Sequence, residues 1–155
     1  MAEEAFERLR RILSDGEHLE RMAELGARTQ LSPGLIKTMI RLHQSGGTSM
    51  GDMARRMGCD PSYITALVDD LDARGLAKRV PDPIDRRVKN IVLTDAGQAL
   101  ATEIDEVLSV PPVAFNALSN TELRHLRDLL DKVIAADPAL QRDGAPATKK
   151  LAATR

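Results

Sequence analysis

The chain has 155 residues, of which 43% are hydrophobic and 29% charged, a composition typical of a soluble globular domain. Its net charge of −1 excludes a wholesale polycation but leaves a local basic surface open, because the distribution of charge matters more than its sum. One cysteine, Cys59, excludes a disulfide framework, and no apolar run approaches the roughly 20 residues that cross a bilayer.

Helical periodicity dominates the N-terminal part of the chain. Apolar residues recur at spacings of three and four over residues 9–26, which predicts one long first helix. Ser32 followed by Pro33 is typical of a helix N-cap and the first helical position. A second helix is therefore expected to begin here and to end at Gly46.

Two further helices are expected on either side of a tight turn. A short helix spans residues 49–57, and a turn at Gly58 leads into a helix over residues 61–74 that ends near Gly75. A short helix, a turn and a longer helix form the pattern of a helix-turn-helix. The second of these helices is expected to bury one apolar face, formed by Ile64, Leu67, Val68 and Leu71.

The periodicity then changes from helix to strand. Residues 76–80 and 90–93 have the composition of short strands, and the stretch between them is rich in turn residues. This pattern predicts a two-stranded ribbon directly after the helix-turn-helix.

Helical signals return towards the C-terminus. Thr94 caps a helix that two consecutive prolines interrupt, and Ser119 with Glu122 fits the capping box of a last helix. Residues 138–155 have no periodicity and an excess of basic residues, so we expect a disordered basic tail.

Charge is unevenly distributed along the chain. Residues 78–89 carry a net charge of +3, whereas residues 1–27 carry −3 and residues 94–137 carry −5. This segregation favours a protein that presents the ribbon to phosphate and keeps both acidic ends away from it.

The start of the helix over residues 61–74 is the candidate DNA-reading surface. If its apolar face is buried, the residues left to project are Ser62, Tyr63, Thr65 and Ala66. Hydroxyl and small apolar groups there can bond phosphate oxygens and base edges or contact a thymine methyl. Alone, the same pattern also fits a helical hairpin with a solvated acidic end.

The basic ribbon favours the DNA-binding interpretation. A ribbon directly after a recognition-type helix forms a wing, and Arg86 and Arg87 at its tip can enter a minor groove. Lys89 adds a third base. Asp85 is better suited to hold one guanidinium and shape the loop than to contact phosphate. The alternative is an exposed hairpin with ordinary surface charge.

Two stretches carry a resemblance to a known family. Residues 85–94, DRRVKNIVLT, fit the pattern D-x-R-x-x-x-V/I-x-L-T, and the following residues 95–97 continue it. Residues 74–76 are similar to the segment that links the recognition helix to the wing in the same family. Residues 32–100 thus resemble the MarR family of winged helix-turn-helix transcription regulators, and with the flanking helices the resemblance covers about residues 5–136.

The resemblance implies a repressor or activator that binds a pseudo-palindromic operator as a homodimer. It implies regulation by a small phenolic or other ligand, or by cysteine oxidation. In the wing it favours Arg86 as the inserted residue and Arg87 as the internal partner of Asp85. It also implies an effector pocket between the first two helices and the helix that begins at Thr94, near His18, Met22, Met39 and His43.

Dimerisation also has support from the residues themselves. The terminal helices carry long apolar stripes, which pack either against a second copy or against each other. A competing function is an interaction or structural dimer with a winged fold that does not bind DNA specifically. Residues 48–95 favour that alternative, because their eight bases and eight acids leave the lobe neutral.

Other functions have little support in the sequence. No catalytic triad, paired carboxylates or Gly-rich phosphate loop is present, and the three histidines lie far apart, so we expect no enzyme, cofactor or metal site. Cys59 is expected to pack as a small apolar residue. The charged N-terminus lacks a signal-peptide pattern, which predicts a cytoplasmic protein without membrane contact.

Taken together, the patterns predict a mainly α fold with a small β-wing, a winged helix-turn-helix flanked by dimerisation helices. Residues 1–30 are expected to form an N-terminal dimerisation helix and residues 31–94 the DNA-binding lobe. Residues 95–137 would form C-terminal dimerisation helices, and residues 138–155 the tail.

Overall fold

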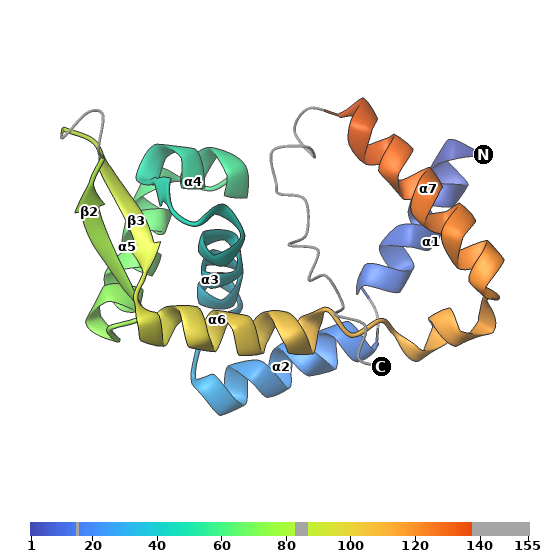
Figure 1. Cartoon of the computed structure of the whole chain (residues 1–155), viewed down its shortest axis with the longest axis horizontal. Helices are drawn as coiled ribbons and strands as arrows, with labels where there is room; N and C mark the ends of the chain where they lie inside the picture. Colours follow the sequence, from blue (N-terminus) through green and yellow to red (C-terminus); the bar gives the residue numbers. More distant parts are fainter. Residues whose placement is uncertain (15, 83–86, 138–155) are drawn as a thin grey trace, which may run out of the picture.

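A computed structural model describes residues 1–14, 16–82 and 87–137 (Figure 1). The elements in chain order are α1 (Ala2–Ser14), α2 (Glu17–Thr29), α3 (Pro33–Ser45), β1 (Thr48–Ser49), α4 (Met50–Met57), α5 (Pro61–Ala73), β2 (Ala77–Pro81), β3 (Lys89–Leu93), α6 (Asp95–Leu108), a 3₁₀ helix (Val113–Ala117) and α7 (Asn120–Ala136). The predicted mainly α fold with a small β-wing is confirmed. The predicted tail over residues 138–155 lies outside the described residues.

Local capping chemistry sets where most of the helices begin. In each case a side-chain oxygen of the N-cap residue accepts a hydrogen bond from a backbone N–H of the first turn: at Ser32, Thr94 and Ser119, as predicted, and also at Ser49 and Asp60. The capping box between Ser119 and Glu122 is complete. These bonds satisfy N–H groups that no earlier helical carbonyl can reach.

The wing is a three-stranded antiparallel sheet in the order β1-β3-β2. The predicted ribbon of β2 and β3 is confirmed, with Arg79 opposite Ile91. The third strand, β1, was not predicted, because two residues show no alternation; it pairs Thr48 with Ile91. Gly47 precedes it with φ +130°, and a Cβ there would lie 2.8 Å from Val92 Cγ1, so the close approach of β1 to β3 requires glycine.

The core is centred on α3, which packs against α2, α5, α6 and β3. Met39, Met53, Ile64, Leu71 and Ile91 are among its fully buried side chains. Cys59 packs at the edge of this core, as predicted. Through this core, α5 and strand β3 of the wing both pack against α3.

The predicted long first helix is wrong. It is divided into α1, which ends at Ser14, and α2, which begins at Glu17. Gly16 adopts φ 86° and ψ −139°, a conformation available almost exclusively to glycine. The apolar spacing continues across the break, because side-chain periodicity does not report backbone dihedrals.

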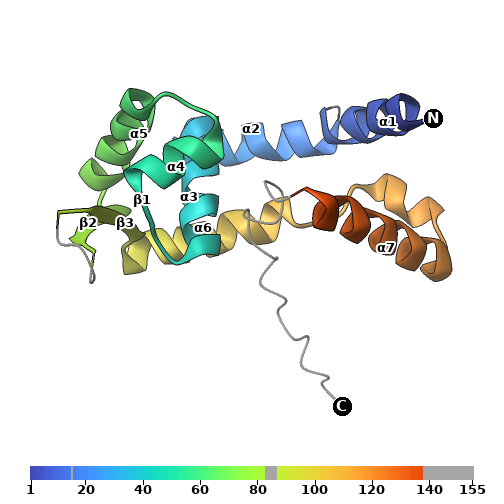
Figure 2. The ribbon, with the colours of Figure 1, turned by 90° about the horizontal axis from the view of Figure 1, so that it is seen from above.

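Both terminal helices extend away from the lobe formed by α3–β3. Neither α1 nor α7 contains a buried residue among those described. The two helices overlap in Figure 1, but Figure 2 shows that they do not lie side by side. The large apolar side chains exposed on them include Phe6, Ile12, Leu129, Val133 and Ile134. No helix in the described part of the chain is long and apolar enough to span a membrane.

Candidate nucleic-acid interface

Helix α5 is divided into a buried and an exposed face. Ile64, Leu67, Val68 and Leu71 are buried, as predicted, which turns the residues near the N-terminus outward. The exposed set is the predicted one: Ser62, Tyr63, Thr65 and Ala66. The Asp60 cap and Pro61 at the first helical position fix where this turn begins.

The two small hydroxyls on this surface already donate hydrogen bonds within the protein. Ser62 Oγ donates to Asp60 Oδ1 over 2.5 Å, and Thr65 Oγ1 donates to the Pro61 carbonyl over 2.9 Å. Their oxygens still have lone pairs that can accept from a base amino group or from water. In this arrangement Ser62 and Thr65 are thus better placed to accept a hydrogen bond than to donate one to phosphate.

The Ser62 contacts also affect the acid that caps the helix. Hydrogen bonds from the Ser62 side chain and then from its backbone N–H lower the pKa of Asp60. The carboxylate is thus kept ionised at the positive end of the helix dipole.

Acidic residues on α5 form ion pairs around the base of the wing. Asp69 Oδ1 lies 2.5 Å from Arg79 Nη2 on β2, and Asp70 Oδ1 lies 2.6 Å from Arg74 Nε. The i,i+4 spacing of the second pair was visible in the sequence. The first pair joins residues ten positions apart on two different elements, so it could be found only from the fold. The first pair partly neutralises an arginine of the otherwise basic ribbon, and the second partly neutralises the arginine at the C-cap of α5.

The end of the wing is described only in part. Arg87, Val88 and Lys89 are exposed, and Asn90 Nδ2 donates to Asp82 Oδ2 over 2.8 Å across the ribbon. Arg86 and Asp85 lie outside the described residues, so the predicted roles of these two residues stay predictions.

The four residues expected near an effector pocket are not brought together among the described residues. Met39 is fully buried in the core, and Met22 packs at its edge. His43 Nδ1 on α3 lies 2.5 Å from Gln98 Nε2 on α6. His18 lines a cavity of about 360 Å³ between the N-terminal helices and the segment that follows α6.

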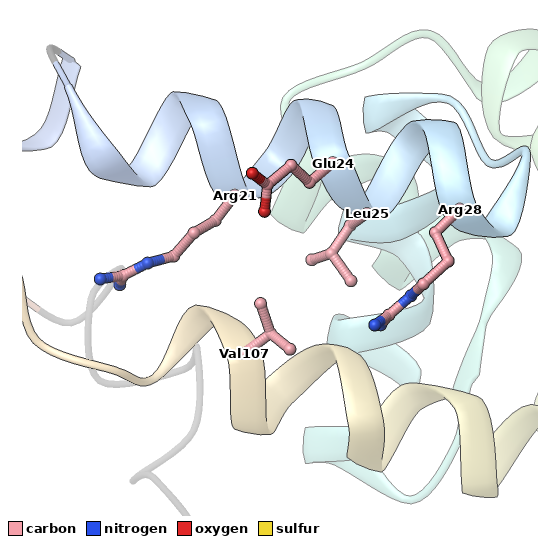
Figure 3. A pocket seen from close by; sticks show the side chains of 5 residues that line it. All are labelled: Arg21, Glu24, Leu25, Arg28 and Val107. Carbon is pink, nitrogen blue, oxygen red and sulfur yellow. The ribbon is translucent and has the colours of Figure 1, made fainter.

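Two cavities lie along α2. The larger, with His18, is lined mainly by apolar side chains, among them Ile12, Leu108 and Phe115, and also by Arg21. Arg21 is held by Glu17 over 2.8 Å and by the Val110 carbonyl. A smaller cavity of about 150 Å³ lies where Leu25 on α2 faces Val107 on α6, with Arg21, Glu24 and Arg28 around it (Figure 3). Neither Arg21 nor Arg28 was singled out in the sequence.

The described residues contain no group of three or more His, Cys, Asp or Glu side chains arranged to hold a metal ion.

Comparisons with known proteins agree with this arrangement. The model of the MarR family matches residues 22–89. The chain is 30% identical to the uncharacterised HTH-type transcriptional regulator YhbI and 31% identical to the HTH-type transcriptional repressor MdtR, both of Bacillus subtilis strain 168. The matches cover 59% and 57% of this chain, and 60% and 54% of those proteins, so the chain spans little more than half the length of these relatives.

A solved structure extends the match over most of the chain. CouR from Rhodococcus jostii RHA1, solved with p-coumaroyl-CoA bound, is 30% identical with a TM-score of 0.60. The alignment covers 75% of this chain and 82% of that one. The similarity therefore extends beyond the winged lobe, and the chain belongs to the MarR family.

Proposed function

We propose that the chain is a sequence-specific DNA-binding transcriptional regulator, and a repressor whose activity depends on a ligand. The observation that carries this proposal is the exposed N-terminal turn of α5 together with the basic ribbon, whose strand β2 packs against the same helix. The relatives named as HTH-type regulators and repressors support it.

In this proposal α5 enters the major groove by its N-terminal turn. Ser62, Tyr63, Thr65 and Ala66 then lie against base edges and the adjoining backbone. The wing reaches the neighbouring minor groove with Arg86, while Arg87 and Lys89 contribute charge near phosphate. Asp69 and Asp70 are occupied by ion pairs, which reduces their repulsion of the duplex.

The regulator acts as a homodimer on a pseudo-palindromic operator. The exposed apolar side chains of α1 and α7 support a second copy as their partner, because such surfaces are rare on monomers. A two-fold dimer would place two α5 helices roughly 34 Å apart, one turn of DNA.

An effector would act on the helices that join the lobe to the terminal helices. The cavity beside His18 is of the size that small-molecule sites occupy, and CouR supports an organic acid derivative as ligand class. His18 would contact the effector directly. The effector would act indirectly on three further residues, because these pack or hydrogen-bond between α2, α3 and α6: Met22, Met39 and His43.

The test is a DNase I footprint on the DNA upstream of the gene, followed by fluorescence anisotropy on the protected site. Arg86→Ala should cost roughly 1–3 kcal/mol of binding free energy. Arg87→Ala should cost less, and combining it with Asp85→Ala should be markedly less than additive. Circular dichroism shows that each variant stays folded.

The alternative is a winged interaction dimer without specific DNA binding. The neutral charge of residues 48–95 and the paired arginines at the base of the wing favour it. Unchanged affinity in both arginine variants, or no footprint at all, would support this alternative against the proposed function.

A further inference from the structure

A glycine on α3 lies directly against the tyrosine of the α5 turn. Gly34 is the second residue of α3, and a Cβ built on it would lie 2.5 Å from Tyr63 Oη. The same Cβ would lie 3.5 Å from Tyr63 Cζ and 3.3 Å from Leu67 Cδ2. The tyrosine hydroxyl therefore occupies the space that any other residue at position 34 would fill.

The atom that this Cβ would crowd is Tyr63 Oη, at the far end of the tyrosine side chain. A contact of 2.5 Å between carbon and oxygen is too short to persist, so one group has to move. Moving the Tyr63 ring disturbs no backbone, because this side chain is 47% exposed. A side chain at position 34 would thus displace Tyr63 at little cost to the fold.

Tyr63 has a free hydroxyl where this placement holds it. Among the described residues, none forms a hydrogen bond with Tyr63 Oη. By contrast, Ser62 and Thr65 on the same turn already donate within the protein. Tyr63 therefore supplies the uncommitted hydroxyl donor of this surface.

We propose that Gly34 is a positioning residue for DNA binding: because it has no side chain, it leaves the space that the Tyr63 ring occupies between α5 and the start of α3, and from there Oη can donate to a backbone phosphate. The proposal rests on the proposed function for its DNA contact. The placement of Tyr63 by Gly34 is a separate claim, and it can be measured without DNA.

The experiment compares Gly34→Ala with Gly51→Ala in the full chain. Gly51 is also the second residue of a helix. It is exposed, and a Cβ there would meet nothing within 4 Å. Tyr63 is the only tyrosine and tryptophan is absent, so near-ultraviolet circular dichroism around 275–280 nm and tyrosine fluorescence report this one ring. Thermal unfolding and operator anisotropy complete the measurements.

Gly34→Ala should change the tyrosine signal and weaken operator binding at least about fivefold, with little change in thermal midpoint. Gly51→Ala should leave the tyrosine signal and the affinity unchanged. Tyr63→Phe should weaken binding to operator and to unrelated duplex alike, because phosphate contacts carry no sequence information. In the Tyr63→Phe background, Gly34→Ala should have almost no further effect on affinity.

An unchanged tyrosine signal in Gly34→Ala would overturn the placement. An equal loss of affinity from Gly34→Ala with and without the Tyr63 hydroxyl would show that Gly34 does not act through Tyr63. If Gly34→Ala unfolds, Gly34→Ala/Tyr63→Phe should refold, and its failure to do so would overturn the steric argument. Absence of DNA binding in the unaltered chain contradicts the proposed function instead, while the tyrosine signal still decides the placement.

Discussion

Gly97 on α6 lies directly against the backbone of Leu76, the residue that precedes β2. A Cβ on this residue would lie 1.8 Å from the Leu76 carbonyl oxygen and 2.8 Å from its carbonyl carbon. Both are backbone atoms, so no side-chain rotation can relieve the contact. The residue is buried in the first turn of α6, where the chain leaves β3.

Gly97→Ala should therefore destabilise the fold by roughly 1–3 kcal/mol or more, the usual cost of overpacking. Gly51→Ala is the matched control, since it is helical and its Cβ meets nothing. Alanine there should raise stability by up to about 1 kcal/mol through helix propensity. Urea unfolding of both variants measures the difference. Equal stability of the two would contradict the close approach.

A second residue-scale prediction concerns pH. The Ser62 hydrogen bonds lower the pKa of Asp60 in the folded chain, so their stabilisation is present above the unfolded pKa of this carboxyl. It is lost as pH falls through the lowered folded value. Ser62→Ala should raise the pKa of Asp60 towards its ordinary value, as followed by NMR of the side-chain carboxyl. No change in that pKa would show that the bond does not form in solution.

At the scale of single residues, the sequence predicts those features that depend only on neighbouring residues. The N-caps at Ser32 and Thr94 depend on a few neighbouring residues, so their spacing suffices. The roles of Gly34 and Gly97 depend on residues about 30 and 20 positions away, which no local pattern contains. The exposed face of α5 was predictable because its buried partner face is periodic.

The junction of wing and α6 is the main element-scale feature. Thr94 Oγ1 donates to the Gly75 carbonyl over 2.7 Å and accepts from Gly97 N over 3.0 Å. One side chain thus caps α6 and ties it to the end of α5.

Thr94→Ala should lower stability by about 1–2 kcal/mol, because it removes an N-cap and a bond between elements. Thr102→Ala is the control: its hydroxyl donates only to the Gln98 carbonyl within α6. Thermal unfolding should show a lower midpoint for the first variant alone. A similar midpoint for both would contradict the tying role of Thr94.

Elements of ordinary length were predictable from their periodicity, but two features were not. The break at Gly16 depends on a backbone dihedral, and β1 exists only through pairing with β3. His18 and Met22 lie four residues apart on α2 and Met39 belongs to the apolar stripe of α3, yet Met39 lies in the core while His18 lines a cavity. Periodicity identifies a buried face without distinguishing core from cavity.

For the whole molecule, the proposed function assigns the state of assembly to the terminal helices. Leu129 and Val133 of α7 are each 58% exposed and lie four residues apart on one helix face. In the proposed homodimer a second copy covers them. Leu129→Glu/Val133→Glu should halve the mass measured by light scattering, whereas Lys132→Glu, at an exposed polar position, should not. Removing residues 115–155 should have the same effect as the double variant.

A truncated chain that remains dimeric would contradict this assignment. The mass should be measured over a range of protein concentrations, because dimers dissociate on dilution.

The central claim, that α5 and the wing hold a DNA duplex, is tested most directly by the salt dependence of operator affinity. The logarithm of the association constant should fall linearly and steeply with the logarithm of salt concentration, because binding releases counterions from the phosphates. Arg86→Ala should flatten that slope by about one charge. An affinity that does not change with salt, in the unaltered chain on its footprinted site, would contradict the account.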